Sequence, residues 1–398
     1  MPDPIARRSF LATCAATTAF SLPSDSPEPL GSVYLATLPE WGLRPGSGED
    51  QSRKFQSLID TVSERGGGTI VLPPEHGGTS GSYLVQGIRP RSNVLIAGLH
   101  GAMLQLPKSA KTHLIDNNAE SNISRFALCG LILDGGGQDQ TLVRIKRSGS
   151  SGYAWDRGGM YDVELRNAGI GAEIDWAGQV YYSSGRVQNC REGLRLTREH
   201  LYLQDITIWG CRTGVFAQQL LHTHWDHVVF AHGGAESTAV RTPETGGPHI
   251  QESRLVNCEV IDYHRGLDVR YVLDTEISGW RFKAINREGI FAAFSGMVEL
   301  GSCRFLGCGA DASGEYSAVR IVESDQLEGW RIHDNLVRDP KEKPTMKYGF
   351  DLSGLPNTAE AVVGHGNHAR SAIESGYLKR LGHTKFTADN NIGTFETT

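Results

Sequence analysis

The sequence predicts an all-β fold, a single-stranded parallel β-helix in which one chain winds through stacked coils of short strands. The first observation is a small residue that returns every 21 to 25 residues, with a last interval of 50 that equals two turns of 25. This column contains Ala168, Cys190, Cys211, Gly233, Cys258 and Cys308. The second observation is a short β-type run before each member, usually followed by Gly and an aliphatic residue, as in Gly193-Leu194. A fixed period of this length is typical of solenoids.

The third observation is the composition of the repeating unit. Gly is frequent, at 48 of 398 residues, and long apolar runs with helical periodicity are missing, which favours strands and turns over helix pairs. One coil of roughly 22 residues, at about 3.3 Å per strand residue, fits three short strands. Stacked coils align equivalent residues, so the column is predicted to be an internal ladder. Its cysteines are expected to be buried free thiols, although Cys190 and Cys211 could come within disulfide reach.

A helix is expected at about residues 51–65, before the repeats begin. Phe55, Leu58, Ile59 and Val62 share one helical face, and the three glycines at 66–68 end the helix. We expect this helix to cover the open end of the β-helix and to protect its strand edges from pairing with other chains.

The first 30 residues resemble a twin-arginine export signal followed by a linker. Arg7-Arg8 precede Ser9-Phe10-Leu11 and a mildly apolar stretch that is too short to span a bilayer. The sequence therefore predicts an exported protein, periplasmic or secreted. The expected division is a leader at 1–30, one β-helix domain at 31–383, and a C-terminal cap or tail at 384–398.

Charge and hydropathy exclude two classes of protein. The formal net charge is −6, whereas a nucleic-acid binder carries a basic surface. No segment is long and apolar enough to cross a membrane, and 39% hydrophobic with 21% charged residues is ordinary for a folded domain. The sequence does not specify an oligomeric state.

The chain from about residue 40 to residue 370 resembles a known superfamily. Asp50, Phe55, Leu58-Ile59-Asp60, the run from Gly66 to Pro74, a Tyr-Leu-Val strand and Asp134-Gly135 look like the pectate-lyase-like right-handed parallel β-helix superfamily. Within it, Gly42 to Gly46 and Asp50-Gln51-Ser52 are similar to twin-arginine-exported repeat proteins of unsettled function. The usual turn after the two prolines is interrupted here by residues 75–82. The resemblance implies right-handed coils and action on carbohydrates, and leaves open which reaction.

A histidine-rich motif suggests a metal. His222, His224, Asp226 and His227 spell the HxHxDH pattern of metallo-β-lactamase-like hydrolases, which hold zinc and activate water. The motif lies inside the repeat, which opposes that fold. Fully extended, the segment would place His222, His224 and Asp226 on one strand face. A metal-dependent hydrolase using these three residues is therefore a second alternative.

A strip of outward side chains follows the Gly-aliphatic positions. Because strand residues alternate between faces, the residue after each inward aliphatic points outward. The strip and its neighbours supply the expected substrate-binding residues Arg195, Phe216, Arg241, His264, Phe291 and Arg320. Arginines can clamp carboxylates and aromatic rings can pack on sugars, so the strip could bind an acidic or hydroxyl-rich polysaccharide. A merely solvated polar face is the competing interpretation.

The expected catalytic residues are Glu173, His224, Asp226, Asp268 and Arg270. Elimination from a uronate needs a base, for which His224 or Arg270 could serve, and a cation such as Ca²⁺, the one cofactor considered, held or oriented by Asp226 and Asp268. Hydrolysis instead needs two carboxyl groups, and Asp175 and Asp262 are additional candidates.

The leading prediction is an exported polysaccharide lyase, slightly ahead of a glycoside hydrolase or transferase. The alternative is a non-catalytic polysaccharide-binding or envelope-associated protein. No metal site is assigned.

Overall fold

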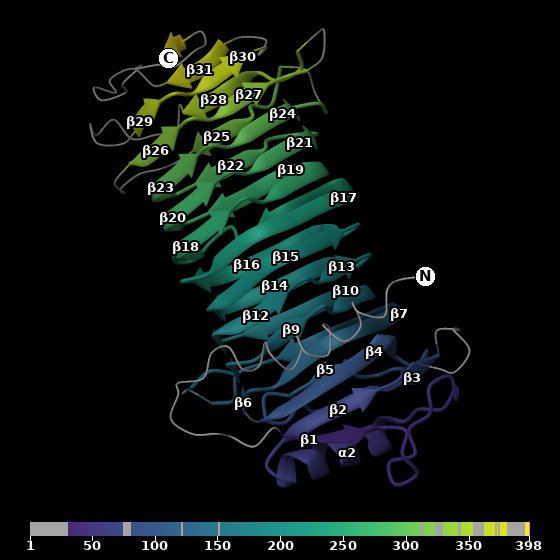
Figure 1. Ribbon diagram of the computed structural model, residues 1–398. Helices are drawn as coiled ribbons and strands as arrows, with labels where there is room; N and C mark the ends of the chain where they lie inside the picture. Colours follow the sequence, from purple (N-terminus) through teal and green to yellow (C-terminus); the bar gives the residue numbers. More distant parts are fainter. Residues whose placement is uncertain are drawn as a thin grey trace, which may run out of the picture.

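A computed structural model describes residues 31–74, 81–120, 122–149, 152–311, 314–322, 329–340, 344–352, 362–370, 372, 375–379 and 395–397. The described chain forms a parallel β-solenoid of about 10 turns, with 59% of residues in strands and 4% in helix. Figure 1 shows the coils stacked along one axis from the helix at one end to β31 at the other. The predicted leader at 1–30 lies outside the described residues, and among the described residues no helix is long and apolar enough to cross a membrane.

Each coil contributes strands to three faces, joined in register by parallel pairing. Long strands such as β17 bend around the corners and take part in more than one face. The first face contains β1 (Ser32–Leu35), β2 (Gly68–Leu72), the start of β4 (Val94–Gln105), the start of β7 (Ala127–Ile145), β9 (Gly159–Tyr161), β12 (Val180–Ser183), the first half of β15 (Leu201–Trp209), the start of β17 (His224–Arg241), β18 (Ile250–Val256), β20 (Val272–Ser278), β23 (Gly296–Gly301), β26 (Trp330–His333) and β29 (Val362–His365).

The second face follows the first along every coil. It contains β3 (Ser82–Leu84), the later parts of β4, β7, β15 and β17, the starts of β10 (Glu164–Asp175) and β19 (Glu259–Arg270), β13 (Arg186–Gln188), β21 (Arg281–Ile285), β24 (Arg304–Cys308), β27 (Leu336–Arg338) and β30 (His368–Arg370).

The third face closes each coil. It contains β5 (Ile115–Asp116), the ends of β7, β10, β17 and β19, β14 (Glu192–Glu199), β16 (Thr213–Leu221), β22 (Ile290–Ala293), β25 (Val319–Val322), β28 (Tyr348–Leu352), β31 (Ser375–Lys379) and β32 (Phe395–Thr397). A separate sheet is formed by β6 (Ile123–Ser124), β8 (Trp155–Asp156) and β11 (Ala177–Gly178). Most of the predicted tail at 384–398 lies outside the described residues, but β32 pairs with β31 and adds a rung.

The predicted capping helix is confirmed. Helix α2 (Ser52–Glu64) buries Phe55, Leu58, Ile59 and Val62, the four residues of its apolar face, and contacts β2 and β4. Figure 1 places it across the end of the stack.

The corner between the first and second faces repeats one backbone conformation. A single residue per coil adopts the left-handed region, with φ between 52° and 68°. The column comprises Gly130, Asp162, Ser184, Asp205, His227, Asn257, Gly279, Ser302, Asp334 and Gly366. Gly, Asn and Asp tolerate this region best, because short polar side chains bond locally and Gly has no Cβ. The corner therefore selects short polar residues and points their side chains outward.

The inward cysteine column is only partly as predicted. Ala168, Cys190 and Cys211 align in register, and the column continues through Tyr263 and Ile285 to Cys308. Cys258 does not belong to it. That residue aligns with Val228 on one side and with Trp280 and Cys303 on the other, at the start of the second face. The prediction is wrong there because the coil between β17 and β19 is longer than its neighbours.

The cysteines of the described residues are buried and free, as expected. Burial raises the pKa of the Cys303 thiol to about 12, so it stays protonated and unreactive at neutral pH. These residues serve as packing groups.

Candidate functional site

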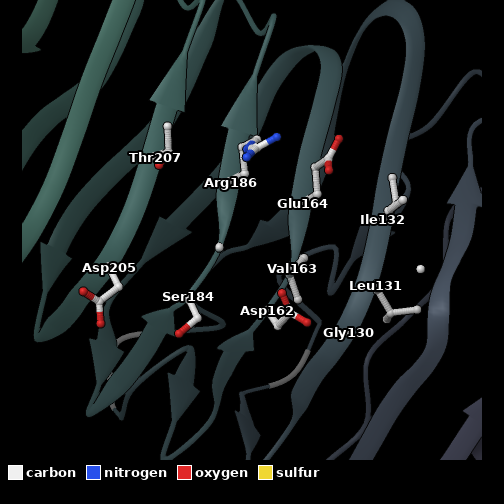
Figure 2. Close-up of a pocket in the computed structure, with 12 residues that line it drawn as sticks. Gly130, Leu131, Ile132, Asp162, Val163, Glu164, Ser184, Arg186, Asp205 and Thr207 are labelled. Carbon is white, nitrogen blue, oxygen red and sulfur yellow. The ribbon is translucent and has the colours of Figure 1, made fainter. Parts of the chain in front are cut away.

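A groove of about 670 Å³ runs along the corner between the first and second faces. It is lined by residues of β4, β7, β10, β13 and β15 and by the corner residues that precede β10 and β13. Figure 2 shows its polar side chains in two rows. One row holds the corner residues Asp205, Ser184 and Asp162, and the other holds Thr207, Arg186, Glu164 and Ile132, which pair in register on the second face. We call this feature the corner groove.

Two carboxyl groups in the groove occupy different environments. The side chain of Asp162 reaches solvent, but the groove walls desolvate it enough to raise its pKa above the ordinary value. The side chain of Asp205 is 54% exposed and lies 3.7 Å from Nδ1 of His227. Ser184 occupies the coil between them, so Asp162 and Asp205 are two coils apart. At the usual strand spacing their Cα atoms therefore lie about 9.6 Å apart. Asp162 is therefore the more desolvated carboxyl group, with a raised pKa, and Asp205 is the more solvated one.

A third carboxylate is held in place by hydrogen bonds. Glu164 Oε1 accepts from Gln188 Nε2 at 2.7 Å and from Arg166 Nη1 at 3.1 Å. Arg166 also donates to Asp134 at 2.7 Å, so the network extends along the second face. Two partners fix the Glu164 carboxylate at the edge of the groove, where its charge contributes to the local field.

Arg186 is the groove's cation. It is exposed, and within the described residues no carboxylate lies at ion-pair distance from it. Three carboxyl groups and one guanidinium nevertheless give the groove acidic character. An acidic groove disfavours a polyanion and stabilises positive charge that develops on a bound group.

Aromatic side chains adjoin the groove on the first face. The rings of Tyr181 and Tyr202 stack with centroids 4.7 Å apart and planes 15° from parallel. Each tyrosine lies three residues before a groove residue, Tyr181 before Ser184 and Tyr202 before Asp205. Tyr181 is 41% exposed, so the pair offers a partly open apolar surface beside polar groups. This combination is suited to packing against sugar rings.

The residues predicted to be catalytic do not lie in one place. His224 and Asp226 are on the first face, where β17 begins, whereas Glu173, Asp268 and Arg270 are on the third face. Asp226 accepts a hydrogen bond from Asn257 at 3.0 Å and lies 3.4 Å from His227. Asp226 and Asp268 therefore cannot bind one Ca²⁺ together, and the predicted catalytic residues split into two separate groups.

The predicted outward strip on the third face is a single register column. It runs through Asp116, Arg144, Glu173, Arg195, Phe216, Arg241, Asp268, Phe291, Arg320 and Asp351, and we call it the third-face strip. The inward-outward alternation placed seven of these residues in the column as predicted: Glu173, Arg195, Phe216, Arg241, Asp268, Phe291 and Arg320. His264, predicted to bind substrate with them, lies outside the column. The strip's capacity to bind a polymer depends on whether its charged side chains are already paired.

The charges of the strip are paired with one another. Glu173 contacts Arg144 at 3.3 Å, Lys146 at 3.1 Å and Arg195 at 3.7 Å, and only 15% of its side chain is exposed. Arg195 also binds Glu192 at 2.7 Å. These contacts tie three neighbouring coils together and neutralise their own charges.

The same pattern continues further along the strip. Arg265 donates to Asp268 at 2.7 Å and to Glu288 at 3.0 Å, and its guanidinium lies 5.0 Å from the centroid of Phe291. Arg270 stands 5.8 Å from the same ring. Asp268 is therefore a partner of Arg265.

The remaining predicted binding residues also have partners of their own. Arg241 lies 3.5 Å from Glu244, and Arg320 lies 3.5 Å from Asp351. The ring of His264 lies 3.1 Å from Asp311. The guanidinium of Arg195 lies 5.9 Å from the centroid of Phe216. Other candidates stand elsewhere: burial raises the pKa of Asp175, and Asp262 occupies a corner with φ of 55°, hydrogen-bonded to His232.

The predicted metal motif is not assembled. His222 has φ of 52°, so the segment turns at this residue and the extended geometry assumed for His222, His224 and Asp226 is wrong. His222 instead contacts Glu252 at 3.1 Å. Among the described residues, the group whose ligand atoms gather within metal-binding reach is His333, Asp334 and His365.

The sequence interpretation missed Asp162, Asp205 and Glu164. A signal was available: polar residues at 162, 184, 205 and 227 recur every 21 or 22 residues, and the first three of them are short. That period matches the coil, and the left-handed corner requires such residues.

The comparisons with known proteins agree on the fold. The A-module of mannuronan C-5 epimerase AlgE4 from Azotobacter vinelandii matches with a TM-score of 0.59 and 13% identity, over 92% of this chain and 97% of that one. The A-module of AlgE6 from the same organism gives 0.56 and 15%, over 90% and 99%. A double mutant of the tailspike protein of E. coli bacteriophage HK620, in complex with a pentasaccharide, gives 0.57 and 13%, over 89% and 76%.

The chain is a right-handed parallel β-helix. No known family profile matches it, and no curated protein matches it in sequence. At these low identities the likeness extends to the fold, so the chemistry has to come from the residues of this chain.

Proposed function

We propose that this protein is a glycoside hydrolase that cleaves a hydroxyl-rich polysaccharide in the corner groove. The observation that carries the proposal is the pair of unlike carboxyl groups, Asp162 with a pKa raised by desolvation and the solvated Asp205. Two carboxyl groups in contrasting environments are the requirement for acid and base roles in glycosidic cleavage. The fold neighbours support a saccharide ligand in general, because they include an epimerase of mannuronan and a tailspike in complex with a pentasaccharide. The choice of a neutral, hydroxyl-rich polymer rests on the acidic character of the groove.

The roles follow from the two environments. Asp162, whose pKa is raised by desolvation, is the proposed general acid and donates a proton to the glycosidic oxygen of the leaving sugar. Asp205 removes a proton from a water molecule that attacks the anomeric carbon from the opposite side. Inverting hydrolases separate these two carboxyl groups by about 6.5–9.5 Å, which leaves room for the attacking water. The Cα atoms of Asp162 and Asp205, about 9.6 Å apart at strand spacing, are too far apart to favour the shorter separation of about 5–5.5 Å found in retaining enzymes. The proposal therefore includes inversion at the anomeric carbon.

The other groove residues fit supporting roles. The transition state is oxocarbenium-like, and the acidic groove, with Glu164 fixed by two hydrogen bonds, favours this positive charge. Arg186, Ser184 and Thr207 can bond sugar hydroxyl groups. Tyr181 and Tyr202 provide a surface on which a neighbouring sugar unit can pack.

Product analysis tests the proposal. The purified chain is incubated with a panel of neutral and uronic-acid polysaccharides, and reducing ends and unsaturated uronides are measured. New reducing ends from a neutral polymer, with inverted anomeric configuration by NMR in the first product, are expected. Retention of configuration contradicts the two-coil pair. Binding without any product supports the non-catalytic alternative.

A lyase is the second candidate, because one register column favours it. Tyr202, His224 and Arg254 occupy consecutive coils of the first face. Elimination from a uronate needs a base and a cation near the carboxylate, and this order supplies an imidazole beside a guanidinium. Arg254 is, however, already bound to Glu276 at 2.7 Å. Unsaturated products that disappear in His224→Ala select this candidate.

We also propose export through a twin-arginine signal. It is supported by Arg7-Arg8 and the following Ser-Phe-Leu. Replacing both arginines by lysine in the full chain is expected to retain the protein in the cytoplasm, and unchanged localisation contradicts the proposal.

A further inference from the structure

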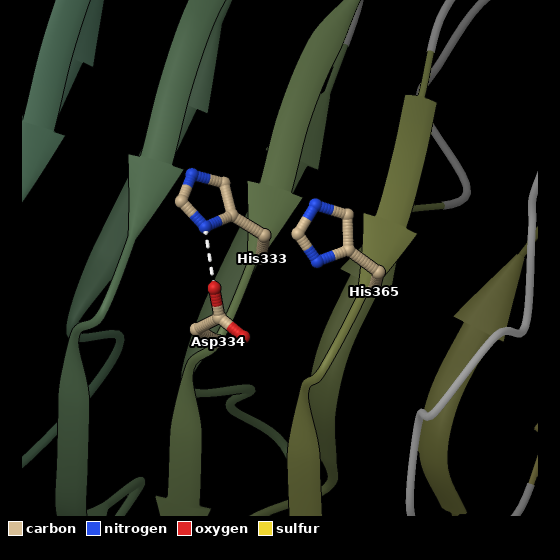
Figure 3. A group of neighbouring side chains, drawn as sticks. All are labelled: His333, Asp334 and His365. Atoms are coloured by element: carbon tan, nitrogen blue, oxygen red, sulfur yellow. Dashed lines mark hydrogen bonds and ion pairs between the residues drawn. The ribbon is translucent and has the colours of Figure 1, made fainter.

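We propose that His333, Asp334 and His365 form a binding site for a divalent transition-metal ion of the zinc class. The site lies where β26 and β29 end, at the corner between the first and second faces. His333 and His365 occupy the same register position on adjacent coils, and Asp334 follows His333 at the left-handed corner. Figure 3 shows the two imidazole rings side by side with Asp334 next to them. The inference does not depend on the proposed hydrolase activity.

The donor atoms are already close together. One ligand atom from each residue lies within 4.8 Å of the other two. Nδ1 of His333 is 2.9 Å from Oδ2 of Asp334, and the two imidazole rings have centroids 5.1 Å apart with planes 25° from parallel. Ligand atoms bound at about 2.0–2.1 Å in a tetrahedral site lie about 3.3 Å from one another. Small side-chain rotations therefore bring all three atoms to coordination distance.

A carboxylate behind the site orients one of the ligands. Oε1 of Glu299 lies 3.0 Å from Nε2 of His333, on the side of the ring away from Asp334. If Nε2 carries the proton and donates it to Glu299, Nδ1 presents its lone pair toward Asp334. Metal-binding histidines commonly have such a carboxylate partner, which fixes the tautomer and raises the basicity of the ring.

Two glycines leave the space that the cluster needs. A Cβ placed on Gly301 would lie 2.6 Å from Cε1 of His333, and one placed on Gly366 would lie 2.2 Å from Oδ1 of Asp334. Any side chain at either position would displace a ligand. Gly366 also has φ of 62°, a conformation that Gly adopts without strain.

The backbone beneath the site is rigid. Asn335 and Asn367 follow the corner on the inner side, and each is 1% exposed. Asn335 donates to the carbonyl of Leu300 at 2.9 Å and to the side chain of Asn367 at 2.9 Å, and Asn367 donates to the carbonyl of Ile332 at 3.0 Å. This buried ladder fixes the relative position of the two coils that carry the ligands. A site supported in this way loses little entropy when it binds an ion.

The donor set selects the class of ion. Two imidazoles and one carboxylate suit zinc and its first-row neighbours, whereas calcium prefers oxygen ligands alone. Three protein ligands leave a fourth position for water. His365 and Asp334 are exposed, so an ion can enter from solvent. The site lies five coils, or about 24 Å, from Asp205, so it is separate from the corner groove.

Zinc titration of the full chain tests the site. Isothermal calorimetry is expected to show one high-affinity Zn²⁺ per chain. His365→Ala and Asp334→Asn should each weaken binding at least tenfold, while Glu299→Gln, which leaves all three ligands, should weaken it by about 10- to 100-fold. Bound Co²⁺ should give the intense visible absorption of a tetrahedral site. Zn²⁺ should raise the Tm of the wild type, because it ties β26 to β29.

The matched control removes the competing histidine motif. His222→Ala with His224→Ala should leave zinc affinity unchanged, and circular dichroism of every variant should match the wild type. The proposal is overturned if the wild type binds no Zn²⁺, if His365→Ala binds as tightly as the wild type, or if the control double variant abolishes binding. His365→Ala is expected to keep the polysaccharide-cleaving activity of the groove. A failure of the zinc proposal can therefore be distinguished from a failure of the hydrolase proposal.

Discussion

The corner groove and the third-face strip are both outward rows of charged side chains in register, but they differ in how their charges are used. In the strip, Glu173 is bound by three cations, and Asp268 is bound by Arg265, which also binds Glu288. In the groove, Asp162 is partly desolvated, and Arg186 has no carboxylate at ion-pair distance among the described residues. Charged side chains that pair with one another, as in the strip, stabilise the stack of coils. Charged side chains without such partners, as in the groove, remain available to a ligand.

The largest expected effect is the loss of activity when a carboxyl group of the corner groove is replaced. Replacing Asp205 by Asn removes the proposed base and should lower kcat/KM by about 10²–10⁴-fold, which is the usual contribution of a general base. Arg144→Ala in the strip should change kcat/KM little. Both values come from reducing-end kinetics on a polymer that the wild type cleaves. A larger loss in Arg144→Ala than in Asp205→Asn would reverse the assignment of the two rows.

The strip should respond in stability instead. Glu173→Gln keeps the shape of the side chain but leaves Arg144, Lys146 and Arg195 without their shared partner. The free energy of unfolding should fall by about 2 kcal/mol, since hydrogen bonds to charged groups are worth this much. Denaturant unfolding measures the change, with the exposed pair Arg212–Glu236 as a matched control through Glu236→Gln, expected near zero. Equal changes in the free energy of unfolding of the two variants would contradict the structural role proposed for the strip.

A smaller effect is expected beside the groove. Tyr202→Ala removes one ring of the stacked pair and should raise KM by about 2- to 10-fold, because aromatic packing is worth about 0.5–1.5 kcal/mol. Since Tyr202 does not take part in proton transfer, kcat should hold. A fall in kcat with unchanged KM would show that Tyr202 acts in chemistry.

The smallest effect is a pH dependence. The pKa of Asp162 is raised in the folded state by desolvation, so the folded chain keeps a proton that the unfolded chain loses at lower pH. Its contribution to stability is complete below the unfolded value of about 3.9 and is lost as the pH rises through the folded value. Asp162→Asn should flatten the stability profile over this window. An unchanged profile would mean that the groove does not desolvate Asp162.

Much of the fold could be predicted from the sequence, because it depends on local rules. The apolar face of α2 follows from helical spacing, and the strip from Glu173 to Arg320 follows from alternation along strands. Cys258 was misplaced because coil length varies, and a count along the chain cannot distinguish a longer coil from a shifted register.

The candidate site was harder to predict, because it depends on the corner. His222 appeared to share a face with His224 and Asp226, but a left-handed residue turns its side chain away. The pairing of charges across coils is also hidden from the sequence, since Arg195 and Glu173 are 22 residues apart and meet only in register. Asp162 and Asp205 could have been recognised from the period of short polar residues.

The most direct test compares two exposed aspartates with left-handed backbone, Asp162 in the corner groove and Asp274 within β20. Asp162→Asn removes the proposed general acid, while Asp274→Asn makes the same change at an exposed left-handed residue that does not line the groove. Turnover is measured on the polymer that the wild type cleaves, with circular dichroism to confirm folding. Turnover is expected to fall by about 10²–10⁴-fold in Asp162→Asn and to stay at the wild-type value in Asp274→Asn. Wild-type turnover in a folded Asp162→Asn variant would contradict it.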